Sequence, residues 1–168
     1  QASRPLTPPS CVQAHYLAAM ANSGYVVESA VVPAPLDALW ALISPMTFKF
    51  SKSVSQASKE ACDQPGSLGT YSICYSDNTV QTVRVTEISE RLPNTRSIGM
   101  EYISSDPAMS YAGRMDQIIL KAITLSEVSM TFVEFSSDFS SDASMEVLED
   151  SKFKKHEFFN DLAAFVKR

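Results

Sequence analysis

The chain has 168 residues, a net charge of −5 and 45% apolar residues, a composition typical of one globular domain. A domain of this length buries roughly 70% of the surface that its unfolded chain exposes, so it needs neither a metal nor a disulfide to build a core. The excess of acidic side chains argues against an electrostatic grip on nucleic acid or on an anionic membrane. Nucleic-acid binding is therefore disfavoured.

The sequence predicts neither a membrane-spanning helix nor a closed metal site. No apolar run approaches the roughly 18–20 residues that an integral membrane helix requires. Cys11, Cys62 and Cys74 cannot all pair within one chain and lack CxxC spacing, which favours free thiols in a reducing compartment. Only His15 and His156 are histidines, and we expect neither a metal nor a cofactor.

The first 23 residues have the pattern of an N-terminal extension. Residues 1–10 carry three prolines among Ser and Thr, which is typical of an irregular leader. Ser10 is the predicted cap of a short helix that runs to residue 22, with apolar side chains at helical spacing. This helix either covers the domain or docks on a protein partner through residues 10–23.

The main domain is predicted to cover residues 24–168 and to begin with a strand and a short helix. Residues 25–32 are rich in β-branched side chains, and Pro35 suits the first turn of a following helix. One apolar face of that helix contains Leu36, Leu39, Trp40 and Ile43. Residues 46–50 form a segment too short to assign beyond a second short turn, so either one helix or a pair of helices follows the strand.

From Ser53 the apolar pattern changes from helical spacing to alternation, which predicts strands. The turns between them are short and rich in Asp, Asn, Pro and Gly, so neighbouring strands are antiparallel. The predicted strands cover residues 54–60, 70–76, 80–89, 96–102, 114–124 and 128–139. Apolar residues of one parity give this sheet a single apolar face.

Helical spacing returns after residue 139. Asp142 or Ser144 is the predicted N-cap of one long helix over residues 145–166, whose second half has a clear apolar stripe. In the first half, Lys152, Lys154 and Lys155 surround Phe153, which indicates either a kink or a stretch that does not pack on the core. The order of elements predicts an α+β domain with a curved antiparallel sheet and a packing helix.

Together with this order, three sequence segments carry a family resemblance. Residues 25–43 run from a strand through Pro-Ala-Pro and an acidic residue to a Trp, and residues 66–70 and 83–93 look like central strands. The chain thereby resembles the birch-pollen-allergen-like (SRPBCC) superfamily, which includes START lipid-transfer domains, polyketide cyclases and coenzyme Q-binding proteins. The resemblance covers about residues 24–168. It implies a helix-grip fold, in which a seven-stranded sheet wraps around the C-terminal helix, with short helices after the first strand.

In the resembled family, the space between sheet and helix is a ligand cavity that is open at one end. The resemblance therefore implies a set of ligand-binding residues, although the same side chains would equally form a packed core. The candidates are Tyr71, Ile73, Tyr75, Val83, Val85, Ile98, Met100, Tyr102, Val133, Phe135, Phe158 and Leu162. The inward face of the last strand is ambiguous, because both parities carry large apolar groups.

Polar side chains at such a cavity would orient an apolar ligand. The hydroxyls of Tyr71, Tyr75, Tyr102 and Tyr111 are candidates for this role. Arg114 and Glu134 are alternatives if their faces turn inward, where an unpaired charge would be costly.

No catalytic constellation is evident. His156 is conceivable as a general base, but its charged neighbours favour a surface position. There is no Gly-x-Ser-x-Gly elbow, and Cys74 is expected to be a small strand residue rather than a nucleophile. Acidic residues between 138 and 150 lack EF-hand spacing, and Gly66 and Gly69 lack the Lys of a phosphate-binding loop.

Three functions are compatible with the sequence. The favoured one is binding or transfer of a small hydrophobic ligand, such as a lipid, isoprenoid, polyketide or pigment. The second is a cyclase or dehydratase that uses the same cavity, where orientation supplies much of the catalysis. The third is a structural or assembly subunit with a collapsed cavity. The resemblance, and the lack of a recognisable catalytic set, favour the first.

Overall fold

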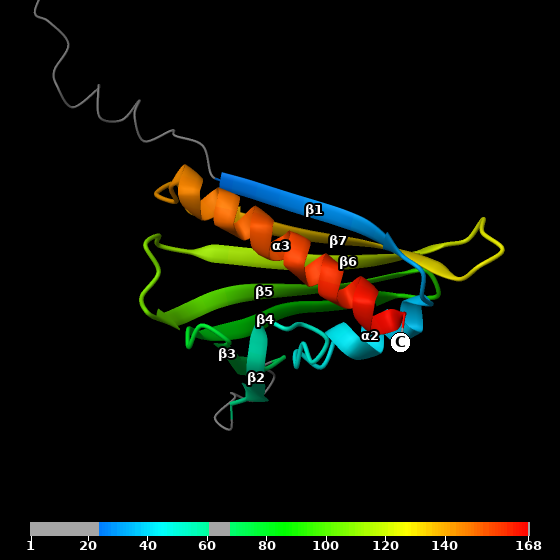
Figure 1. Cartoon of the computed structure of the whole chain (residues 1–168), viewed down its shortest axis with the longest axis horizontal. Coiled ribbons are helices and arrows are strands. Elements are labelled where there is room, and N and C mark those ends of the chain that lie inside the picture. Colours follow the sequence, from blue (N-terminus) through cyan, green and yellow to red (C-terminus); the bar gives the residue numbers. More distant parts are fainter. Residues whose placement is uncertain (1–23, 61–67, 168) are drawn as a thin grey trace, which may run out of the picture.

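A computed structural model describes residues 24–60 and 68–167. Seven antiparallel strands form one curved sheet in the order β1-β7-β6-β5-β4-β3-β2, and a long helix crosses its inner face (Figure 1). The strands are β1 (Gly24–Val32), β2 (Val54–Lys59), β3 (Thr70–Tyr75), β4 (Val80–Arg91), β5 (Thr95–Asp106), β6 (Arg114–Ile123) and β7 (Met130–Phe139). The helices are α2 (Leu36–Ile43) and α3 (Met145–Val166). This is the helix-grip architecture expected from the sequence.

Every predicted strand is present, and the largest difference in length is at β5, whose hairpin partner β4 is also longer than predicted. Both strands continue past their apolar centres, so that Val80 pairs with Asp106 at one end and Arg91 pairs with Thr95 at the other. The added ends consist mostly of polar residues, which do not alternate with apolar ones. Backbone pairing between two long neighbours therefore extends the hairpin beyond the stretch that the hydrophobic pattern marks.

A single short helix follows β1, where more than one was expected. Residues 46–50 form turns and no helix, with Met46 and Phe48 at positive φ values of 58° and 44°. This backbone region is unfavourable for large side chains. Both side chains are buried, so packing against the core compensates for the backbone cost.

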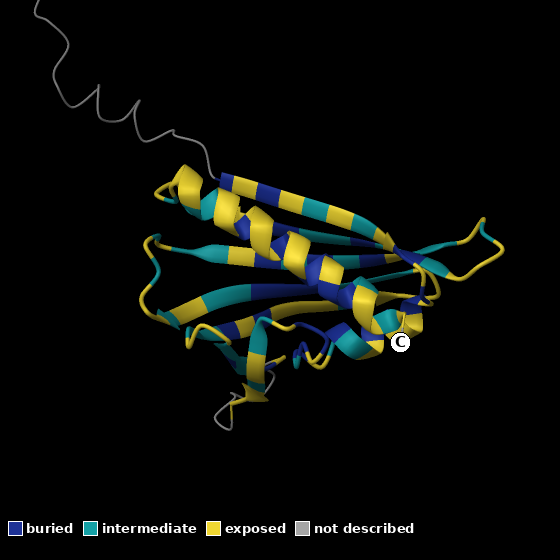
Figure 2. Ribbon diagram, in the orientation of Figure 1, coloured by how far each residue is buried: buried dark blue, intermediate teal, exposed yellow. Residues whose placement is uncertain are grey.

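The C-terminal helix α3 is one continuous element. Ser144 is its N-cap, because the serine hydroxyl accepts a hydrogen bond from the Val147 N–H at 3.3 Å. The residues on the inner face include Ser151, Lys155, Phe158 and Leu162, at helical spacing, and all are buried. The opposite face of the helix is largely exposed (Figure 2). Of the lysines around Phe153, Lys155 turns inward, which interrupts the apolar stripe without a kink.

The interior has an apolar end and a polar end. The large apolar residues of the core come from α2, the turns after it, the sheet and the second half of α3. The least exposed of them are Leu39, Ile43, Met46, Ile98, Ile118, Leu120 and Leu162. Around the middle of α3 the buried residues become polar, and they include Asp116, Ser137, Ser151 and Lys155.

Some sequence-based predictions fall on residues 1–23 and 61–67, which lie outside the described residues. These are the short helix of the extension, its possible role in partner docking, and the environments of Cys11, Cys62 and His15. In the described part of the chain, neither helix combines the length and the apolar character that crossing a bilayer requires.

Candidate functional site

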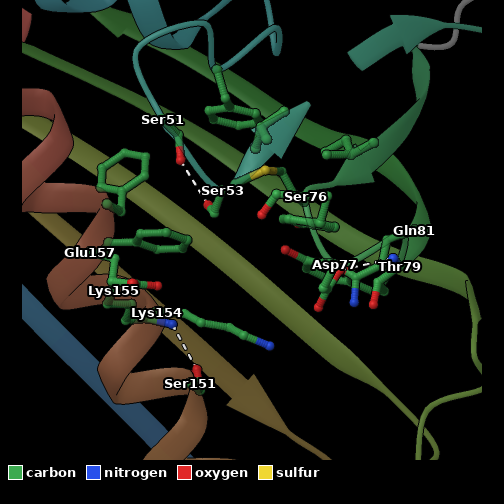
Figure 3. Close-up of a pocket in the computed structure, with 18 of the residues that line it drawn as sticks. Ser51, Ser53, Ser76, Asp77, Thr79, Gln81, Ser151, Lys154, Lys155 and Glu157 are labelled. Atoms are coloured by element: carbon green, nitrogen blue, oxygen red, sulfur yellow. Dashed lines mark hydrogen bonds between the residues drawn. The ribbon is translucent and has the colours of Figure 1, made fainter. Parts of the chain in front are cut away.

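A cavity of about 240 Å³ lies between α3 and the inner face of the sheet. Its apolar wall consists of Phe48, Val54, Ile73, Met100, Phe135 and Phe158. Figure 3 shows polar residues of α3 on one side of the cavity and polar residues of the β3–β4 hairpin on the other. The hairpin contributes Ser76, Asp77, Thr79 and Gln81, and the loop before β2 contributes Ser51 and Ser53.

Half of the predicted ligand-binding residues line this cavity. They are Ile73, Tyr75, Met100, Tyr102, Phe135 and Phe158. The other six pack in or against the hydrophobic core and do not reach the cavity: Tyr71, Val83, Val85, Ile98, Val133 and Leu162. Alternation identifies the inward face correctly for both groups. It cannot show where along that face neighbouring side chains fill the space.

The structure resolves the ambiguous face of β7. Phe135 lies opposite Ile118, and Ser137 lies opposite Asp116, in the β6–β7 pair. Ile118 and Asp116 are buried, so the odd-numbered residues of β7 face inward. Glu134 has the other parity and does not line the cavity. Tyr111 also lies away from the cavity wall and packs edge-on against Phe139, with ring centroids 5.2 Å apart.

Asp116 is the centre of a buried hydrogen-bond network at the polar end of the interior. Its Oδ1 atom accepts hydrogen bonds from Arg114 Nε at 2.8 Å and Ser137 Oγ at 2.5 Å. Its Oδ2 atom accepts from Arg114 Nη2 at 2.6 Å and the Tyr102 hydroxyl at 3.2 Å. The side chain of Asp116 has no exposed surface, so these four donors replace its hydration.

Arg114 turns inward and lines the cavity, as one of the two sequence-based alternatives requires. Its guanidinium lies over the Tyr102 ring, 4.3 Å from the centroid, in a cation–π contact. Burial by itself lowers the pKa of Arg114, but the paired Asp116 carboxylate outweighs burial and holds the pKa well above its usual value. Arg114 is therefore a permanent cation at the cavity wall.

Tyr75 and Tyr102 are protonated at neutral pH and present hydroxyl groups to the cavity. Burial raises the pKa of Tyr75 to about 12. Burial is also the main reason that the pKa of Tyr102 is well above its usual value, and the Asp116 carboxylate contributes to the increase. Neither phenol is a base near neutral pH, so the chemistry that both offer is hydrogen bonding.

Lys155 is the most unusual residue at the site, because only 1% of this lysine is exposed. Its Nζ atom donates to the hydroxyls of Ser137 and Ser151 and lies 4.4 Å from the centroid of the Phe135 ring. Burial lowers the pKa of Lys155 to about 8, against the opposing effect of the Asp116 carboxylate. This amine therefore titrates close to neutral pH.

The lowered pKa of Lys155 predicts that stability rises between pH 8 and pH 10. The unfolded state, with an ordinary lysine pKa of 10.5, binds more protons than the folded state in this range. We expect the free energy of unfolding to increase by up to about 2–3 kcal/mol, measured by urea unfolding at each pH. Above pH 10 the buried tyrosines oppose the trend, because their folded-state pKa values are raised. Lys155→Met should abolish the increase, and an unchanged profile in that variant would contradict its assignment to Lys155.

The other candidate reactive groups lie outside the cavity wall. His156 is about half exposed, and its Nε2 atom is 3.0 Å from Glu28 Oε2 on the facing strand β1. Cys74 is a half-buried free thiol whose side chain is not part of the lining. His156 therefore has the surface position that its sequence context favours.

No family model and no curated protein matches this sequence. Solved structures do match: a protein from Nitrosospira multiformis has a TM-score of 0.65 at 22% identity, over 84% of this chain and 94% of that one. A START superfamily protein from Mycobacterium smegmatis has a TM-score of 0.63 at 12% identity, over 85% and 97% of the two chains. A major latex-like protein from Panax ginseng has a TM-score of 0.59 at 12% identity, over the same shares.

These similarities define the class of fold. The chain has the helix-grip fold shared by START and birch-pollen-allergen-like proteins, as the sequence resemblance implies. At 12–22% identity the comparisons show the fold alone, because one fold supports many functions. Function has to be argued from the cavity and its residues.

Proposed function

We propose that this domain binds a small, largely hydrophobic molecule in the cavity between α3 and the sheet. The observation that carries the proposal is an unfilled volume of about 240 Å³ with an aromatic and aliphatic wall. Protein interiors are otherwise packed as densely as organic crystals, so a void of this size is costly unless something occupies it. The candidate ligand contacts are Ile73, Tyr75, Met100, Tyr102, Phe135 and Phe158.

The composition of the wall favours binding over the two alternatives. A cyclase or dehydratase needs a group that moves protons near neutral pH. His156 is outside the cavity, and the raised pKa of Tyr75 and Tyr102 keeps both phenols protonated. Lys155 has a pKa lowered to about 8, but its amine is held by the hydroxyls of Ser137 and Ser151 with only 1% of the residue exposed. An assembly subunit with a collapsed cavity would have this volume filled by side chains. Transfer of the ligand between membranes or proteins is a further step that this proposal does not require.

The first test is denaturing extraction of freshly purified protein, followed by mass spectrometry of the released small molecules. We expect a hydrophobic species that is absent from an identically purified unrelated protein. Adding that species back should raise the Tm by mass action. An empty extract, together with no Tm shift from any hydrophobic compound tested, would count against a binding function.

A blocking variant provides a second test. Ser53 is half-buried and lines the cavity, and Ser53→Trp would place a large ring in the space proposed for the ligand. We expect about a tenfold or greater loss of ligand affinity, which corresponds to about 1.4 kcal/mol. Ser58→Trp is the matched control, because Ser58 is exposed on the same strand region and does not line the cavity. Equal affinities of the two variants would place the ligand elsewhere.

A further inference from the structure

Lys155 is buried, and no residue in the described part of the chain forms an ion pair with it. Its two hydrogen bonds go to the neutral hydroxyls of Ser137 and Ser151. An ammonium group has three donors, so one N–H lacks an acceptor in this part of the chain. Fully buried lysines are rare unless they are paired, because removing the charge from water is costly.

The two carboxylates that act on Lys155 already have other partners. Asp116 forms a bidentate ion pair with Arg114 and accepts two further hydrogen bonds from hydroxyls. Glu28 of β1 pairs with His156 at 3.0 Å and with Lys152 at 3.8 Å. The buried charges of Arg114, Asp116 and protonated Lys155 therefore sum to one positive charge.

This excess positive charge lies at the wall of the cavity. Lys155 and Arg114 both line it, together with the hydroxyl-bearing Tyr75 and Tyr102 (Figure 3 shows Lys155 on α3). The other charged residues of the lining are exposed: Asp77, Lys154 and Glu157. Water and salt screen exposed charges much more strongly than buried ones. The interior of the cavity is thus positive, whereas its rim carries charges of both signs.

We propose that the ligand of the binding function proposed above carries a carboxylate, and that this group pairs with the Lys155 ammonium inside the cavity. The carboxylate supplies the missing negative charge and an acceptor for the third N–H, in a charge-assisted hydrogen bond. The Tyr75 hydroxyl is a further donor on the same wall, and Phe135 and Phe158 face the apolar part of the molecule. A volume just below the range of about 300–1,000 Å³ typical of ligand pockets favours an acid with one short chain.

This pairing makes the affinity depend on pH. The charged groups that act on Lys155 are Asp116 and Arg114 from β6 and Glu28 from β1. The other charged or titratable groups that line the cavity are Tyr75, Asp77, Tyr102, Lys154 and Glu157. Arg114 and the two tyrosines have raised pKa values, whereas burial lowers that of Lys155 to about 8. Below this pH the amine is charged, so the affinity for a carboxylate should be constant. Above it, the Kd should rise about tenfold per pH unit as the free protein loses the proton.

Calorimetric titration with matched acids and alcohols tests the inference. The probes are hexanoate, decanoate and tetradecanoate, each compared with the primary alcohol of the same chain length at about pH 6.5, where carboxyl groups are ionised. We expect the best acid to bind about tenfold or more tightly than its alcohol. Lys155→Met should abolish this preference, so that each acid binds no more tightly than its alcohol. Lys152→Met removes an exposed lysine from the same helix and should keep the preference.

The outcomes separate this inference from the proposed function. If acids and alcohols bind equally to the unaltered protein, the carboxylate pairing is wrong and the binding function stands. If the preference for acids persists undiminished at pH 10, or survives in Lys155→Met, the assignment to Lys155 is wrong. If no acid and no alcohol binds at any chain length, both proposals fail. The pH profile is measured on the unaltered protein, so it still tests the inference if Lys155→Met folds poorly.

Discussion

Asp116→Ala is expected to lower the free energy of unfolding by about 3–5 kcal/mol, because it leaves buried cations without an anion. The Arg114 guanidinium, 13% exposed, would lose a bidentate partner, and its pKa is too high for it to become neutral. The Tyr102 and Ser137 hydroxyls would lose an acceptor at the same time. The loss should appear as a lower urea midpoint with an unchanged m-value.

A double variant distinguishes the loss of the ion pair from a general defect of packing. Arg114→Met combined with Asp116→Leu removes both charges and keeps apolar volume in their place. Replacing a whole buried pair in this way is often neutral or stabilising, whereas removal of one partner is costly. We therefore expect the double variant to be more stable than Asp116→Ala. A loss below about 1 kcal/mol in Asp116→Ala would mean that water replaces the carboxylate, and that the network is wetter than its burial suggests.

The sheet and the long helix were predictable because local patterns and tertiary contacts agree in them. Val83 and Val85 lie two residues apart on β4 and face the same side of the sheet, and Phe158 and Leu162 lie four residues apart on one face of α3. In both elements the spacing of the apolar residues along the sequence matches the face that is buried in the fold. The backbone conformation of the turns after α2 was not predictable. Met46 and Phe48 adopt positive φ only because the core binds their side chains, and no local propensity indicates such a conformation.

The candidate site was only half predictable. Alternation assigns a residue to a face, but the distance between that face and α3 decides whether the residue meets a cavity or another side chain. The polar network has a different cause, since charged residues such as Asp116 and Lys155 are usually solvated. Two signals were present in the sequence. Asp116 has the same parity as the buried Ile118, and Lys155 lies three residues before Phe158 on the inner face of α3.

Phe158→Ala is expected to destabilise the fold by about 3–5 kcal/mol, the usual cost of truncating a buried aromatic residue. Phe158 is the hub of an aromatic cluster in which every pair is edge-to-face. The ring centroids of its partners are 5.1 Å away for Phe50 and Phe135, 5.5 Å for Phe159 and 6.4 Å for Phe48. Such pairs contribute about 0.5–1.5 kcal/mol beyond the area that they bury. The cluster joins α3 to β7 and to the turns after α2, so its loss weakens both junctions together.

The position of Phe158 at the cavity wall gives this variant a second consequence. The space left by the ring would join the existing cavity. Neighbouring side chains would fill this joined space less completely than they would fill a small isolated void. Phe153→Ala is the matched control on the same helix, because Phe153 is 61% exposed and its truncation should change stability by less than about 0.5 kcal/mol. Urea unfolding measures both changes. A loss in Phe158→Ala close to that of the control would show that the remaining aromatic rings move into the space, and that the cavity wall is adaptable rather than fixed.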